Sequence, residues 1–179
     1  GFVITTAACL AYLDEQRLPG ALMDDVRAHV AQLERKTGKS FGSATNPLLV
    51  SVRSGSAMSM PGMMDTILNL GLNPATLKGL MAQTGNERFA WDAYRRFVQL
   101  FGKIAMGIPD EAFDDAMAAV KRKHGAVHDV ELGTGALEEL AQAFLSVYRD
   151  HTGQPLPIDP HEQLERSIEA VFRSWNGKR

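Results

Sequence analysis

The sequence predicts an α+β fold that is predominantly helical and contains one or a few strands. Apolar residues recur at helical spacing through most of the chain, and capping residues and glycines mark the helix ends. A single run, 48–53, is apolar and contains β-branched residues, which is typical of a strand. The apolar and charged fractions, 45% and 22%, are those of a soluble globular domain.

Two helices are expected before the strand. Thr5 or Thr6 can cap a short first helix that continues to Leu13. Pro19 suits the first position of a second helix, where its missing N–H would have no partner anyway. Gly38 is expected to end that helix, because glycine readily adopts the left-handed conformation that follows many helices.

Five further helices are expected after the strand. Each begins at a residue that can accept a hydrogen bond from the first turn, and a glycine follows three of them. Glu162 is expected to complete a capping box with Asp159 at the start of the last helix. The expected ranges are 73–85, 86–104, 110–125, 134–153 and 159–175.

The helix expected at 86–104 carries the widest apolar surface. Trp91, Tyr94, Val98 and Phe101 form one stripe, and neighbouring apolar residues widen it. So broad a surface belongs at the centre of a helical cluster. The chain is therefore expected to divide near residue 73, into a strand-bearing part before it and an all-helical part after it.

Charge and cysteine content exclude several classes of protein. The formal net charge of −2 argues against broad electrostatic binding to nucleic acid. The only cysteine, Cys9, excludes an internal disulfide, and its expected role is that of a small buried apolar residue. No apolar run approaches the length of a membrane span, and no secretion signal is recognised. We therefore expect a cytoplasmic protein.

The segment that follows the strand is the part of the sequence that suggests chemistry. Arg53 stands at the end of the strand, small residues follow as far as Gly62, and helical spacing resumes near Met64. Backbone amides can approach an anion where side chains are small, a helix N-terminus adds positive partial charge, and arginine matches phosphate oxygens. This pattern suggests a phosphate site. The alternative is that Arg53 pairs with a carboxylate and the methionines of this segment fill gaps in the core.

The sequence Val-Arg-Ser-Gly-Ser-Ala-Met-Ser-Met-Pro-Gly-Met-Met-Asp-Thr-Ile-Leu-Asn-Leu-Gly-Leu-Asn at 52–73 resembles the ATP-binding region of the pyruvate phosphate dikinase family. The segments 1–6, 84–97 and 170–176 resemble the same family in the same order, so the resemblance covers essentially the whole chain. It implies part of an ATP-grasp nucleotide-binding domain. Residues 1–73 would belong to the first lobe, 74–160 to an inserted helical subdomain, and 161–179 to a helix that returns to the first lobe.

The resemblance also implies which residues bind ATP. Arg53 would contact the phosphates, the segment from Ser54 and Gly55 to Gly62 would form the cradle, and Thr66 would add a hydroxyl. Gly55 and the methionine-rich loop favour the dikinase over relatives of the phosphoenolpyruvate synthase type. No catalytic residue and no metal ligand is expected within the chain.

The family further implies a larger enzyme around this chain. Such an enzyme converts ATP, phosphate and pyruvate into AMP, diphosphate and phosphoenolpyruvate through a phosphohistidine domain and a pyruvate-binding barrel. An ATP-binding lysine would lie upstream, the Mg²⁺ ligands would lie downstream, and the parent is expected to be a homodimer. The isolated chain, as a piece of a domain, is expected to be inactive.

Two other functions remain open. The parent could be a synthase or a small-molecule phosphotransferase with another acceptor, although the loop sequence argues against it. Alternatively, the chain could be a structural or interaction module without nucleotide affinity, because an isolated cradle lacks its opposing lobe.

Several other motifs have simpler interpretations. Gly38-Lys39-Ser40 resembles the end of a P-loop, but the upstream glycine is missing and a helix precedes it. His124 and His128 are expected to be surface residues separated by a helix end, not metal ligands. Arg95 and Arg96 are interpreted as structural, ion-paired residues in preference to nucleotide contacts. Asp65 is expected to cap the helix near Met64, with metal contact as the less favoured role.

Overall fold

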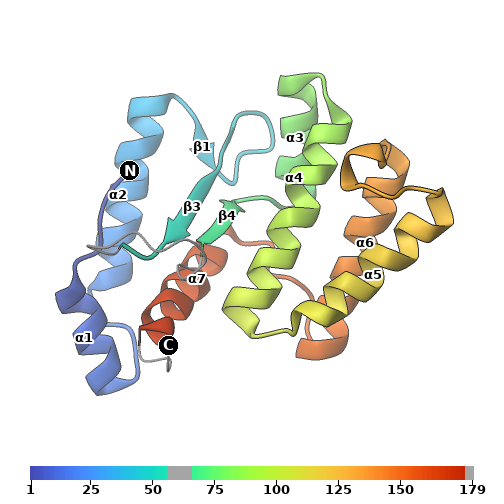
Figure 1. Ribbon diagram of the computed structural model, residues 1–179. Coiled ribbons are helices and arrows are strands. Elements are labelled where there is room, and N and C mark those ends of the chain that lie inside the picture. The colour runs from blue at the N-terminus through green and yellow to red at the C-terminus, as the bar shows by residue number, and fades with distance from the viewer. Residues whose placement is uncertain (56–65, 176–179) are drawn as a thin grey trace.

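The computed structural model describes residues 1–55 and 66–175, and it confirms a predominantly helical α+β fold (Figure 1). A π-helical turn, η1 (Phe101–Ala105), extends α4, and a short 3₁₀ turn, η2 (Asp129–Glu131), precedes α6. The helices are α1 (Thr6–Glu15), α2 (Leu22–Thr37), α3 (Pro74–Thr84), α4 (Glu87–Leu100), α5 (Asp110–His124), α6 (Thr134–Thr152) and α7 (Pro160–Ser174). The strands are β1 (Ser40–Phe41), β2 (Pro47–Leu48), β3 (Val50–Arg53) and β4 (Thr66–Leu70).

The strands form two small sheets. The strand expected at 48–53 is divided at Leu49, because β2 pairs in parallel with β1 whereas β3 pairs antiparallel with β4. Val52 lies opposite Ile67 and Val50 lies opposite Leu70, so β4 contains one residue more than β3 between these pairs. The extra residue forms a β-bulge, and Asn69 there adopts a left-handed conformation with φ 60°.

The expectation of a helix from about Met64 onward is wrong for residues 66–70, which form β4. Ile67 and Leu70 are both fully buried, and their spacing of three residues is that of a helix face. The bulge produces this spacing within a strand, because it shifts the alternation of inward and outward side chains by one residue. Met64 and Asp65, including the capping role expected for Asp65, lie outside the described residues.

Most helix ends follow the expected local signals. Asn73 forms a capping box with Thr76, and Gly85 ends α3 in the left-handed conformation. Several details differ. α2 begins at Leu22, because Pro19 accepts the N–H of Leu22 in a turn before the helix. Asp110 is the first residue of α5 and does not cap it. Glu162 makes no capping box with Asp159, because its carboxylate accepts from Arg166 at 2.6 Å.

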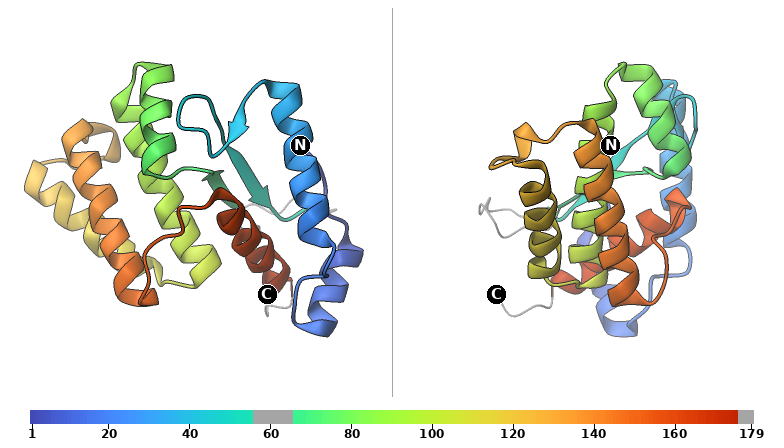
Figure 2. Two further views of the ribbon diagram at one scale, coloured as in Figure 1. Left: turned by 180° about the vertical axis from the view of Figure 1, so that it is seen from behind. Right: turned by 90° about the vertical axis from the view of Figure 1, so that its right-hand side faces the viewer.

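The helices α3 to α6 lie together on one side of the molecule, and α1, α2 and the strands lie on the other (Figures 1 and 2). Within the first group, α6 packs against both α4 and α5, and α3 packs against α4. α7 lies between the two groups and contacts α1, β3, β4 and η1. The last helix thus returns to the strands after the chain has passed through α3 to α6. The division of the chain at residue 73 stays a prediction.

Gln163 on α7 is fully buried and connects this helix to two other segments of the chain. Its Oε1 accepts from the N–H of Gly71 at 2.9 Å, and its Nε2 donates to the carbonyls of Leu72 at 3.0 Å and Pro157 at 2.7 Å. One side chain therefore joins α7 to the turn after β4 and to the connector before α7.

The apolar core is continuous across the molecule and is rich in aromatic residues. Phe113 and Phe144 meet edge to face at 5.1 Å between ring centroids, and Phe101 stacks on Tyr148 at 6.3 Å.

None of the described helices is both long enough and apolar enough to cross a membrane.

Candidate functional site

Arg53 and Thr66 form a directly opposed pair across the antiparallel strands β3 and β4. Residues opposed in this way place their side chains on the same face of the sheet. Arg53 is exposed and Thr66 is partly exposed, whereas the neighbouring pair, Val52 and Ile67, faces inward. The register thus brings together two of the residues predicted to bind ATP, at the two ends of the segment that connects the strands.

The first residues of the predicted phosphate cradle differ in exposure. Ser54 is 6% exposed, whereas Gly55 is exposed and no atom of the described residues lies within 4 Å of the position that a Cβ would occupy. Space therefore remains beside the backbone at Gly55, as close approach by an anion requires. Gly62 lies outside the described residues. The helix N-terminus expected after the cradle is replaced by β4, so that part of the phosphate argument is wrong.

A groove of about 860 Å³ runs from this strand end along the molecule. Its walls come from the N-terminal segment 1–6, from α1 and α2, from the strands β2 and β3, and from α7. The walls are mostly apolar, and Arg53, Ser54 and Gly55 lie on its lining. This size and this combination of apolar walls with few polar groups are typical of ligand sites.

Two threonines of the groove could serve a ligand but were not predicted as site residues. Thr5 and Thr6 line the groove at the start of α1, and Thr5 makes no capping hydrogen bond through its side chain. Sequence reasoning assigned these threonines to helix capping alone. One feature of the sequence could have pointed to them as ligand-binding residues. The first turn of α1 contains no acidic residue, so no side-chain charge there offsets the positive end of the helix dipole.

Cys9 also lines the groove, where burial raises the pKa of its thiol. The thiol is therefore protonated at neutral pH, in agreement with its predicted role as a small buried residue. Within residues 1–55 and 66–175, no group of three or more His, Cys, Asp or Glu side chains is placed to hold a metal ion.

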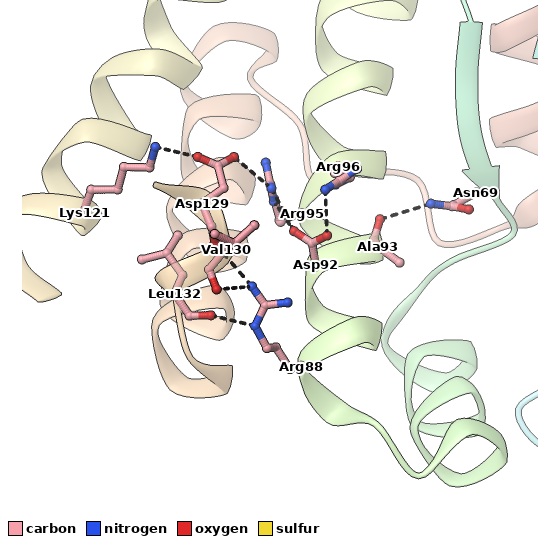
Figure 3. A network of polar contacts seen from close by, with 10 residues as sticks. All are labelled: Asn69, Arg88, Asp92, Ala93, Arg95, Arg96, Lys121, Asp129, Val130 and Leu132. Carbon is pink, nitrogen blue, oxygen red and sulfur yellow. Dashed lines mark hydrogen bonds and ion pairs between the residues drawn. The ribbon is translucent and has the colours of Figure 1, made fainter. Parts of the chain in front are cut away.

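The arginine pair on α4 belongs to a structural network, as the sequence favoured (Figure 3). Arg95 is 4% exposed and forms ion pairs with Asp92 at 2.8 Å and with Asp129 at 3.1 Å. Lys121 also pairs with Asp129, and Arg88 donates to the carbonyls of residues 129, 130 and 132 at 2.9–3.3 Å. These contacts attach the connection between α5 and α6 to α4, on the opposite side of α4 from β4.

The remaining sequence motifs are structural. Gly38 ends α2 in the left-handed conformation, so the Gly-Lys-Ser segment belongs to a helix end and not to a P-loop. α5 ends at His124, and Gly125 separates it from His128. The His124 ring lies 2.9 Å from a carboxylate oxygen of Glu139.

Replacing Asp129 with asparagine is expected to lower the free energy of unfolding by about 1 kcal/mol at pH 7, because two cations lose their shared partner. Lys121 and Arg95 hold the pKa of Asp129 below its ordinary value of 3.8. A carboxylate whose pKa is lower in the folded protein than in the unfolded protein stabilises the fold at pH values above the unfolded pKa. This contribution declines once the pH falls below the unfolded pKa and is gone below the folded pKa. The difference between wild type and Asp129→Asn should therefore shrink between pH 7 and pH 3. Urea unfolding at both pH values measures it, with the exposed Asp114→Asn as control. A deficit of equal size at both pH values would contradict the ion-pair interpretation.

Comparison with known proteins identifies the family of this chain. The family model described as "Pyruvate phosphate dikinase, AMP/ATP-binding domain" matches residues 11–179. The chain is 53% identical over 180 residues to pyruvate, phosphate dikinase of Entamoeba histolytica and 51% identical over 179 residues to that of Giardia intestinalis. It is 43% identical over 181 residues to the protein of that name from Clostridium symbiosum. Each match covers the whole chain but only 20–21% of the relative, so the chain spans about a fifth of the length of these curated relatives. The chain belongs to the family of AMP/ATP-binding domains of pyruvate phosphate dikinase.

Proposed function

We propose that this chain is the ATP-binding part of a pyruvate phosphate dikinase. The parent would convert ATP, phosphate and pyruvate into AMP, diphosphate and phosphoenolpyruvate through a phosphohistidine. The observation that carries the proposal is the opposed pair Arg53 and Thr66. These two residues flank the segment predicted to hold the phosphates, and Arg53 lines a groove of ligand-binding size. The membership in the family supports it.

The chemistry of such a site is positioning and charge stabilisation, which is most of what phosphoryl transfer requires of a protein. Arg53 would neutralise phosphate charge with its guanidinium, which is exposed. The backbone from Ser54 and Gly55 to Gly62 would surround the phosphates, and the Thr66 hydroxyl would donate to them. Mg²⁺, when bound with ATP, would offset the charge of the phosphates; its protein ligands are expected in the parent outside this chain.

The wider setting belongs to the same proposal. The phosphohistidine domain and the pyruvate-binding barrel would lie elsewhere in the parent, which would be a cytoplasmic homodimer. The lengths of the relatives support the existence of further domains, because each relative is about five times as long as the matched segment.

The test is the substrate dependence of AMP formation by the purified full-length parent. A dikinase is expected to form AMP from ATP over many turnovers only when both pyruvate and phosphate are present. AMP formation with pyruvate alone would indicate a synthase, and AMP or ADP formation with an unrelated acceptor would indicate another phosphotransferase. Either result would overturn the dikinase assignment while leaving the ATP site in place. Absence of nucleotide turnover with every acceptor, together with no ATP binding, would favour the structural module.

A further inference from the structure

A second pocket lies away from the groove and shares none of its lining residues. It measures about 170 Å³ and is formed by α4, α6, the start of α3 and the connector before α7. We propose that this pocket binds a small monocarboxylate with an apolar or aromatic body, held by the Tyr94 hydroxyl and the Arg149 guanidinium.

The Tyr94 side chain supplies the first polar group. It is 3% exposed and lines the pocket, and its hydroxyl, which has no hydrogen-bond partner among the described residues, keeps contact with solvent. A hydroxyl on the wall of a pocket can exchange its contact with water for a hydrogen bond to a ligand. Burial raises the pKa of this hydroxyl to about 12, so it stays protonated at neutral pH and can donate. A ligand that offers an acceptor would satisfy it.

Arg149 supplies the charge. It stands in the last turn of α6, is exposed, and lines the pocket. Among residues 1–55 and 66–175, no carboxylate lies within ion-pair distance of its guanidinium. A guanidinium binds a carboxylate through two parallel hydrogen bonds, so an anion of this kind is the natural partner.

The size and walls of the pocket limit the ligand. An apolar cavity of about 150 Å³ holds benzene, so this pocket suits a ligand of roughly six to ten non-hydrogen atoms. Leu145, Leu156 and three prolines supply apolar walls. An aromatic or branched aliphatic acid fits this description, whereas a nucleotide is too large.

The pocket is held open by contacts that do not depend on a ligand. Asn73 donates to the carbonyl of Ile158 at 2.9 Å, and Gln163 donates to that of Pro157 at 2.7 Å. The prolines stiffen the connector further. A preformed pocket binds with little ordering cost. A ligand there would bridge α4 and α6 to the two segments by which the chain enters and leaves α3 to α6.

The experiment is a titration of the 179-residue chain with sodium benzoate, followed by amide chemical shifts. Saturable shifts at residues 73, 145, 149, 156 and 158 are expected, with a dissociation constant of about 1 mM. Benzyl alcohol, which has the same ring without the charge, should bind about tenfold more weakly. Tyr94→Phe and Arg149→Gln should each weaken benzoate binding about tenfold, because each removes a hydrogen bond to a charged group.

The controls separate a specific site from nonspecific binding. Tyr148→Phe and Arg122→Gln change the same residue types away from the pocket lining and should leave the affinity for benzoate unchanged. Amide spectra that remain dispersed show that each variant is folded. The proposal is overturned if benzoate produces no saturable shift at the pocket, or if Tyr94→Phe and Arg149→Gln bind it as tightly as their controls do.

Discussion

Replacing Gln163 with leucine is expected to lower the free energy of unfolding by about 3 kcal/mol or more. Leucine has a similar size, so little volume is lost, but all three hydrogen bonds of the side chain disappear. The N–H of Gly71 and the carbonyls of Leu72 and Pro157 would then be buried without their partner, and each such group costs about 1–3 kcal/mol. The loss should be visible as a lower urea midpoint with an unchanged slope.

The matched control for this change is Gln142→Leu on α6, which alters the same residue type on an exposed helix surface. Its effect should stay within about 0.5 kcal/mol. Gln163→Glu separates hydrogen bonding from shape: it keeps an acceptor for Gly71 but loses both donors and buries a charge, so it should be at least as destabilising as leucine. If Gln163→Leu were as stable as Gln142→Leu, the glutamine would not be what holds α7 to the strands.

The helix ends could be predicted from the sequence because their determinants are local. Asn73, Gly85 and Gly125 act on backbone groups within a few residues of themselves, so the sequence contains all the information that their roles require. β4 could not be recognised in the same way. Its bulge at Asn69 depends on pairing with β3, and the resulting spacing of Ile67 and Leu70 imitates a helix.

Long-range contacts account for the rest of what the sequence did not reveal. Gln163 bonds to residues 91 and 92 positions away, and nothing around it in the sequence distinguishes it from a surface glutamine. The same holds for the candidate site. The residue types at Arg53 and Thr66 follow from the motif, but their direct opposition depends on the strand register. The groove beside them needs walls from segments as distant as the N-terminus and α7.

Replacing Arg53 with alanine in the full-length parent is expected to reduce AMP formation by about 10³-fold, because removing one preorganised charge contact in the transition state costs this much in comparable sites. Arg53 is exposed, and no ion pair joins it to a carboxylate among the described residues, so the fold should keep its stability within about 0.5 kcal/mol. Arg53→Lys keeps the charge but loses the planar pair of donors, so its activity should lie between those of wild type and alanine. The exposed Arg122→Ala is the matched control and should retain full activity.

The direct binding measurement locates the effect of Arg53. In a titration of the 179-residue chain with magnesium-ATP, amide shifts at 53–55 and 66 that vanish in Arg53→Ala would show that the phosphate contact is formed within this chain. Loss of activity in the parent without any shift in the isolated chain would mean that the contact forms only when the other lobe closes on the nucleotide. AMP formation within threefold of wild type in Arg53→Ala would rule out the phosphate role, and the exposed position at the end of β3 would then need another explanation. Arg53 lines the groove and lies opposite Thr66 in the strand register, so its replacement tests the proposed ATP site more directly than any other single change.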